Sequence, residues 1–201
     1  MASWEKIELV DKTFDDQDLS EATFTDCFFT RCRFVGTRLS EVRVQDCRFE
    51  ECDFTDARMN AALFCDSSFS SSTFRGTNLF IASFQNCRLL GATFSDPELG
   101  GMTASGGDWS WLVARHQNFE GVELRAVKLV EADFYGANLQ KVDLREADLT
   151  RANLRDSQLA GANFRGADLS QIDLSLLNIK GAQLDMAQAI KFTQCFGAKV
   201  I

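Results

Sequence analysis

The residues best suited to chemistry in this chain are its seven cysteines and its single histidine. Five of the cysteines are separated by five residues or by multiples of five: Cys27, Cys32, Cys47, Cys52 and Cys87. Such a spacing points to a structural repeat rather than to a metal site or a disulfide framework. Because free cysteine packs like a small hydrophobe, we expect these five side chains to fill the core. Cys65 and Cys195 lie outside the spacing, and their role stays open.

Other routes to catalysis are few. A single histidine, His116, excludes cages of several histidines and leaves a Ser-His-Asp arrangement to chance. No glycine-rich phosphate-binding motif follows an expected strand and opens an expected helix. The many Asp and Asn residues recur with the same five-residue period, which gives them a structural explanation. We therefore predict no catalytic residues, no metal site and no cofactor, hence no enzyme, and we expect His116 at the surface.

A large apolar residue occupies almost every fifth position from Leu9 to Leu184. A period of five fits neither an α-helix, at 3.6 residues per turn, nor a strand, at 2.0, so it indicates a repeat architecture. A small residue lies two positions before each large one, and the residue between them is usually polar. Residues 132–156 show the unit clearly as ADFYG ANLQK VDLRE ADLTR ANLRD.

This unit resembles the A(D/N)LXX consensus of the pentapeptide-repeat family, over about nine tenths of the chain. The resemblance implies an all-β fold, a right-handed quadrilateral β-helix in which four pentapeptides form one coil. About nine coils stacked at ~4.8 Å give a rod of roughly 43 Å. We expect one solenoid domain over residues 1–184, in which each coil contacts only its neighbours.

Residues 97–117 fit the repeat poorly. They contain Pro97, the only proline, and four of the thirteen glycines, a composition typical of a turn or loop. We expect an irregular segment there, either a protruding loop or a distorted coil. Trp109 and Trp111 are candidates for exposed recognition groups, although Trp109 also occupies a core position of the repeat.

Residues 185–201 leave the five-residue period and suit a short amphipathic helix ending near Gly197. They contain more apolar surface than one cap needs, which favours a cap combined with a homodimer contact. The segment is also similar to the C-terminal dimerisation segment of the Qnr and MfpA group, pentapeptide-repeat proteins that protect topoisomerases. The expected interface residues are Met186, Ile190, Phe192, Phe196, Val200 and Ile201.

The net charge of −8 is unevenly spread. Residues 1–60 contain 14 acidic and 8 basic side chains, whereas residues 121–201 contain ten of each. A negative surface repels nucleic acid, so we expect no nucleic-acid partner. The chain has no apolar run long enough for a membrane span and no signal peptide at its start, so we expect a cytoplasmic protein with no membrane contact. Acidic stripes along the rod would suit a basic partner, or would simply keep the rod soluble.

The resemblance to the Qnr and MfpA group implies a DNA-mimicking protein. Such a protein binds DNA gyrase or topoisomerase IV, protects it from fluoroquinolones or albicidin-like poisons, and so confers antibiotic resistance. The residues expected to contact the topoisomerase are Asp96, Asp108, Trp109, Trp111, Arg115, Asp133, Asp143, Glu146, Asp156 and Asp173. In a dimer joined at the C-terminus, however, the neutral half lies at the centre and the acidic half at the tips. The alternative is a scaffold for another protein partner, with no topoisomerase role, since a fold does not define a function.

Overall fold

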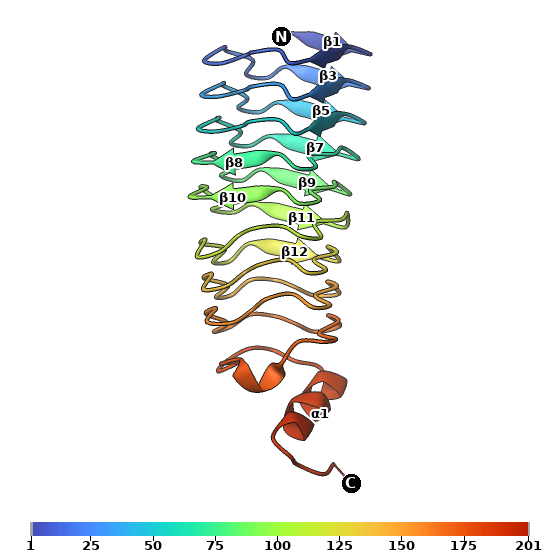
Figure 1. Cartoon of the computed structure of the whole chain (residues 1–201), viewed down its shortest axis with the longest axis vertical. Helices are drawn as coiled ribbons and strands as arrows, with labels where there is room; N and C mark the ends of the chain where they lie inside the picture. The colour runs from blue at the N-terminus through green and yellow to red at the C-terminus, as the bar shows by residue number, and fades with distance from the viewer. Residues whose placement is uncertain (1, 201) are drawn as a thin grey trace.

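The chain forms one rod of stacked coils that ends in a short helix (Figure 1). The structure is a computed structural model and describes residues 2–200. A 3₁₀ helix, Leu174–Leu176, and the helix α1, Met186–Cys195, follow the strands. The strands are β1 (Ser3–Glu5), β2 (Glu8–Val10), β3 (Thr23–Thr25), β4 (Phe28–Thr30), β5 (Arg43–Gln45), β6 (Arg48–Glu50), β7 (Leu63–Cys65), β8 (Thr73–Arg75), β9 (Ser83–Gln85), β10 (Thr93–Ser95), β11 (Thr103–Ser105) and β12 (Glu123–Arg125).

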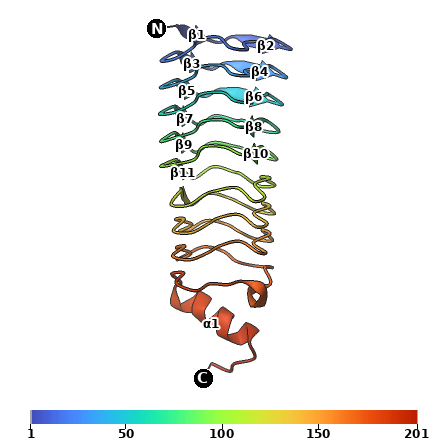
Figure 2. The same cartoon turned by 90° about the vertical axis from the view of Figure 1, so that its left-hand side faces the viewer.

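Adjacent coils pair in parallel with a constant step of 20 residues. The longest sheet runs β1-β3-β5-β7-β9-β11-β12, and the stack β2-β4-β6 lies on another side of the rod (Figure 2). Beyond β12 the same register continues as isolated bridges, as far as the one between Asn163 and Gln183. The predicted fold class, a pentapeptide-repeat β-helix, is confirmed. The 20-residue register spans about nine coils, but regular strands within residues 2–200 end at Arg125, so the strand-bearing part is shorter than the whole rod.

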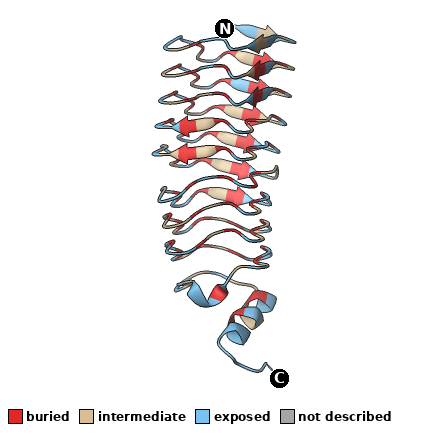
Figure 3. Cartoon of the chain, viewed as in Figure 1, coloured by how far each residue is buried: buried red, intermediate tan, exposed pale blue. Residues whose placement is uncertain are grey.

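The core follows directly from the five-residue unit. From Phe14 to Leu169 the large residues are buried, and so are most of the small residues two positions before them, while the other three positions are mostly half-buried or exposed (Figure 3). In the N-terminal half the inward phenylalanines stack from coil to coil. The ring centroids of Phe14, Phe34 and Phe54 are 4.8 and 5.0 Å apart, which matches the strand spacing.

Each pentapeptide ends at a corner of the rod, where the backbone turns. The corner residue has a positive φ at every corner from Lys6 to Gln171, near +55° in Asp46 and Asp56 and +69° in Gly121. This left-handed conformation is tolerated by Gly, Asn and Asp and is strained for most other residues. The repeat therefore selects its corner residues by backbone geometry as well as by solubility.

Residues 97–117 contain no inserted loop, so that alternative is wrong, but the coil is distorted on one side: no bridge joins Glu98 to Asn118, and the N–H groups of Leu99 and Gly101 have no backbone partner within residues 2–200. Ala104 pairs with both Phe84 and Leu124 in the unbroken register. The core stays filled here because large and small residues exchange places within the repeat. Met102 and Leu112 occupy positions that usually hold a small residue, and both are fully buried. The inward positions that follow them, which usually hold a large residue, hold alanine. Two of the four glycines of this segment, Gly101 and Gly106, are at corners, where positive φ is required.

Helix α1 closes the C-terminal end of the rod, as predicted. The Asp185 carboxylate accepts the Gln188 backbone N–H at 2.9 Å, and the Gln188 side chain accepts the Asp185 N–H at 3.0 Å, which forms a capping box. Gln188 also donates to the Phe164 and Ala167 carbonyls, which ties the helix to the last coils. Gly197 has φ +81° just beyond the helix. Within the described residues, no helix is long and apolar enough to cross a membrane.

Candidate protein-interaction surface

The ten residues predicted to contact a topoisomerase do not form a single patch. The 20-residue register distributes them over three of the four sides of the rod. The side built on Phe14 carries Asp96, Arg115, Asp133, Asp156 and Asp173. The side built on Phe24 carries Asp143 and Glu146, and the side built on Phe29 carries Asp108, Trp109 and Trp111. A flat partner surface therefore reaches only some of them at once.

Four of the candidate carboxylates are engaged in turns. Each directly precedes an inward residue and accepts the backbone N–H two residues further on. The distances are 3.1 Å for Asp108 to Ser110, 3.1 Å for Asp133 to Tyr135, 3.2 Å for Asp143 to Arg145 and 3.2 Å for Asp173 to Ser175. These Asx turns explain why Asp or Asn is favoured at this position in the C-terminal half. We call these residues the turn acids.

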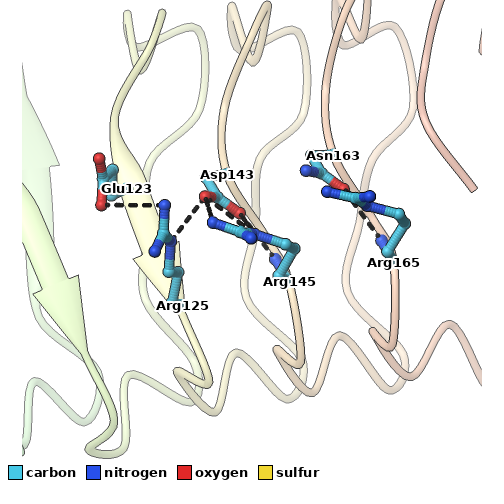
Figure 4. Close-up of polar contacts among 6 residues, drawn as sticks. All are labelled: Glu123, Arg125, Asp143, Arg145, Asn163 and Arg165. Carbon is cyan, nitrogen blue, oxygen red and sulfur yellow. Dashed lines mark hydrogen bonds and ion pairs between the residues drawn. The ribbon is translucent and has the colours of Figure 1, made fainter.

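Asp143 is the most strongly held of the turn acids. Its Oδ2 accepts hydrogen bonds from Arg125 Nε at 2.6 Å and Arg145 Nη2 at 2.8 Å (Figure 4). Partial burial raises the pKa of Asp143, but the hydrogen bonds from Arg145 and Arg125 outweigh that effect and lower the pKa to about 2. One coil further on, Asn163 takes the place of the acid, and Arg165 Nε donates to it at 3.1 Å. The charge of Asp143 is therefore largely neutralised by its neighbours.

The other three candidate acids, Asp96, Glu146 and Asp156, lie at corners. They are exposed, have positive φ and make no ion pair with any residue from 2 to 200. The N-terminal coils carry more acids of this kind, which we call the corner acids. Up to residue 66 they are Asp11, Asp16, Glu21, Asp26, Glu41, Asp46, Glu51, Asp56 and Asp66. Only two cations, Lys6 and Arg31, occupy corners in the same stretch.

The two tryptophans have different environments. Trp109 is 0% exposed and packs edge-on against Phe84 and Phe94, so its assignment as a contact residue is wrong. Trp109 occupies an inward position, and the inward positions before and after it along the chain hold alanine. The large indole ring fills the volume that these alanines leave. Trp111 is 54% exposed at a corner, and its indole N–H donates to Glu131 at 3.2 Å. It remains available to a partner.

Phe80 and Ile81 were missed as candidate contact residues. They are 48% and 52% exposed, and Ile81 adopts a φ of +52°, which is strained for a β-branched side chain. Both occupy outward positions of the repeat, where the unit is otherwise polar. An apolar residue at an outward position is the sequence signal that identifies them.

The predicted dimer residues are mostly exposed at the C-terminal end. Met186 and Phe196 are 77% and 70% exposed, Val200 is exposed and Ile190 is half-buried. Phe192 is only 5% exposed, because it packs against the last coils within its own chain, so its assignment to an interface is wrong. Ile201 lies outside the described residues.

The five cysteines at small positions are buried, as predicted. Four of the thiols donate to carbonyls of the neighbouring coil, as in Cys52 Sγ to Phe29 O at 3.4 Å, and Cys47 donates to Gln45 O in its own coil. Burial raises the pKa of Cys52 and Cys87 to about 12, which keeps these thiols protonated and unreactive. Cys195 is exposed. Among residues 2–200, no group of three or more His, Cys, Asp or Glu side chains is placed to hold a metal ion.

Three solved structures share this architecture. Two are trypsin-treated variants of QnrB1, a plasmid-mediated fluoroquinolone resistance protein, each with a TM-score of 0.91 and 22% identity. They cover 100% and 98% of this chain and 100% and 99% of their own. Full-length QnrB1 gives a TM-score of 0.72 at 20% identity, covering 95% of this chain and 100% of its own. At these identities the likeness shows the fold.

The family assignment rests on the sequence models. A search of curated proteins finds no match. The model of the pentapeptide repeat region matches residues 22–81, and the model of pentapeptide repeats in eight copies matches 118–156 and 157–190. Together they cover well over half of the sequence, in the same frame as the coils of the structure. The chain therefore belongs to the pentapeptide-repeat family.

Proposed function

We propose that this protein is a DNA mimic that binds DNA gyrase or topoisomerase IV and protects it from poisons such as fluoroquinolones or albicidin. In this proposal the protein acts in the cytoplasm, carries out no chemistry of its own and confers antibiotic resistance. It occupies the site on the enzyme that otherwise holds DNA, or displaces the poison from the cleavage complex.

The observation that carries the proposal is the set of corner acids. All but the half-buried Asp26 are exposed, and they lie in columns along the edges of the rod. Most are not neutralised by ion pairs; Asp11 and Arg31, 2.8 Å apart, are an exception. A rod with rows of negative charge along its edges presents a partner with features of a DNA backbone. The shared fold with a fluoroquinolone resistance protein supports the same reading.

The proposal includes a homodimer formed through the C-terminal end. Helix α1 and the segment after it lie beyond the last coil (Figure 1), and they carry the exposed apolar side chains of Met186, Phe196 and Val200. Burying such a patch against its own copy is the simplest way to remove it from water. The corner acids of the first coils then lie at the two tips of the dimer, so we expect the tips to make the strongest electrostatic contacts with a basic enzyme surface.

The test is a supercoiling assay with purified gyrase and ciprofloxacin or albicidin, in which this protein is titrated. We expect supercoiling to be restored at low protein concentration and inhibited at high concentration, because a DNA mimic also competes with DNA. If the folded protein changes supercoiling in neither direction with gyrase, and topoisomerase IV responds no better, the DNA-mimic proposal is wrong. The protein is then a scaffold for a different partner.

A further inference from the structure

Pairing between adjacent coils is lost on two of the four sides near the C-terminal end of the rod. By the 20-residue register, residues 152–161 should pair with residues 172–181, but no backbone hydrogen bond joins these two segments. One coil earlier, six such bonds join residues 132–141 to residues 152–161, at 2.9 to 3.0 Å. The distortion at residues 97–101 is smaller, because pairing is lost there on one side only and strand pairs or bridges hold the other sides.

The residues beyond this break, 172–200, form what we call the C-terminal cap. It consists of an incomplete coil, which contains the 3₁₀ helix, and of α1 with the segment after it (Figures 1 and 2). Backbone pairing attaches the cap to the rod on one side. There Phe164 N donates to Gln183 O at 2.9 Å, and Gln183 N donates to Ala162 O at 2.8 Å. The boundary is therefore paired on that side and open on the two sides that carry residues 152–161.

Two side chains of the cap complete the attachment. The Asp185 carboxylate accepts the Gly166 N–H at 2.9 Å. The Gln188 side chain is buried, and its amide group donates to the Phe164 carbonyl and, at 2.8 Å, to the Ala167 carbonyl. Between regular coils, backbone groups satisfy one another on all four sides. The cap instead depends on one paired side and on these two side chains.

The side chains of the incomplete coil explain why it does not close. Ile172 and Leu177 occupy positions where a small residue is usual, and the inward positions that follow them hold Leu174 and Ile179. Of these four residues only Leu174 is buried, whereas the residues at the same four positions one coil earlier are all buried. Four large side chains thus occupy a space that two large and two small ones fill elsewhere, and they keep the two coils apart.

This boundary should be the weakest in the protein. In a solenoid each coil contacts only its neighbours, so the free energy of unfolding is approximately a sum of terms for coils and for the boundaries between them. Regions with few paired backbone groups and few buried apolar contacts open before the rest. Clefts with volumes of about 720 and 310 Å³ lie along the two open sides, so side-chain packing does not replace the missing hydrogen bonds.

We propose that the C-terminal cap is a separately opening unit, which detaches from the rod while the rod stays folded, and that Gln188 is the residue that holds it closed. The exposed apolar side chains assigned to the homodimer contact, Met186, Phe196 and Val200, all belong to the cap. The dimer contact is then lost and remade without unfolding of the rod. This consequence rests on the proposed homodimer, whereas the opening of the cap does not.

Two spectroscopic probes distinguish the cap from the rod. The only α-helix of residues 2–200 is α1, in the cap, and all three tryptophans, Trp4, Trp109 and Trp111, lie in the rod. Urea unfolding of the full chain is followed by circular dichroism in the helical band and by tryptophan fluorescence. We expect the helical signal to be lost at a lower urea concentration than the fluorescence signal, because the two units open separately. Coincident transitions overturn the proposal.

A pair of variants on α1 tests the role of Gln188. Gln188→Leu keeps the size of the side chain but removes its hydrogen bonds to the rod, so it should lower the urea midpoint of the helical transition and leave that of the fluorescence transition unchanged. Gln194→Leu is the matched control, because Gln194 lies on the same helix but is exposed. It should change neither midpoint. An equal shift in the two variants means that Gln188 does not hold the cap.

Amide hydrogen exchange locates the boundary of the opening unit. The amides of Phe164 and Gln183 should exchange at least about tenfold faster than those of Leu144 and Asn163, which make the same hydrogen bonds one coil earlier. Gln188→Leu should accelerate exchange in the first pair and leave the second pair unchanged. Equal protection of the two pairs contradicts a boundary at this place.

Protein concentration separates this inference from the homodimer. If the dimer contact lies in the cap, the midpoint of the helical transition should rise with protein concentration and that of the fluorescence transition should not. Two separate transitions that are both independent of concentration support the opening cap and contradict the dimer contact. A single transition that depends on concentration has the opposite meaning: the dimer contact stands, and the cap does not open separately.

Discussion

The two halves of the rod use the same five-residue unit with different side chains. In the N-terminal half the inward positions are mostly phenylalanine, whose stacked rings are 4.7 to 5.3 Å apart, and the backbone forms regular strands. In the C-terminal half the inward positions are mostly leucine, and adjacent coils are joined by isolated bridges. Side chains of different shape thus support one backbone path, because the spacing of inward positions sets the fold.

The acids of the two halves also differ in role. The N-terminal acids are largely at corners, where they face solvent, whereas those of the C-terminal half more often hold Asx turns, as Asp133, Asp143 and Asp148 do. A count of charges treats these groups alike. Their hydrogen bonds show that the corner acids are available to a partner and that the turn acids are part of the fold.

The largest effect is expected in the phenylalanine stack. Phe54 is 1% exposed, between Phe34 and Phe74, and Phe54→Ala should lower the free energy of unfolding by about 4 kcal/mol. Leu149→Ala, at an equally buried position of the other half, should cost about 3 kcal/mol. Urea denaturation followed by circular dichroism measures both. A loss below about 1 kcal/mol for Phe54→Ala would contradict the close packing of the stack, because the lost burial and the cavity alone should cost more.

A smaller effect concerns the turn acids and depends on pH. The pKa of Asp143 is about 2 in the folded chain against an ordinary value of 3.8, so its ionised form stabilises the fold. That contribution, about 2 kcal/mol, is present above pH 4 and is lost as the pH falls through the folded pKa. Asp143→Asn keeps the turn but removes the titration. Urea midpoints at pH 5 and pH 2 should therefore differ less in the variant, and an unchanged difference contradicts this account.

The corner acids should matter for the partner and not for the fold. Asp26→Asn, Asp46→Asn and Asp66→Asn together remove three charges at corners where asparagine is also tolerated. We expect the protein concentration that half-restores gyrase supercoiling to rise roughly tenfold, because electrostatic attraction is lost. The control combines Asp133→Asn, Asp148→Asn and Asp168→Asn, which removes the same charge from turn acids. An equal effect of the two triple variants would mean that net charge alone decides binding.

The sequence predicted the solenoid, the buried cysteines and the C-terminal helix, because each follows from spacing alone. It did not decide between a loop and a distorted coil at residues 97–117, and it did not predict that pairing is lost between residues 152–161 and the next coil, because both depend on how side-chain volumes add up across neighbouring positions. Met102 and Ala104 keep their pairing, whereas pairing is absent beside Ile172 and Leu174, although the five-residue period is intact in both. For the contact surface, residue type marked the acids, but only the hydrogen bonds separated turn acids from corner acids.

The smallest expected effect concerns backbone strain at the corners, as distinct from side-chain packing. It can be tested in one column of corner residues that runs from the N-terminal half of the rod into the C-terminal half. Ile81 has φ +52°, and Gly121, two coils further along the same column, has φ +69° with open space around its Cα. Ile81→Gly should raise the free energy of unfolding by about 1 kcal/mol, because relief of strain exceeds the added entropy of the unfolded chain. Gly121→Ile should lower it by a similar amount, since no atom lies within 4 Å to clash with the new Cβ and strain alone acts. If Ile81→Gly instead destabilises the protein, then the Ile81 side chain packs with the exposed ring of Phe80. In that case contacts within the chain, and not a partner, offset the backbone strain at this corner.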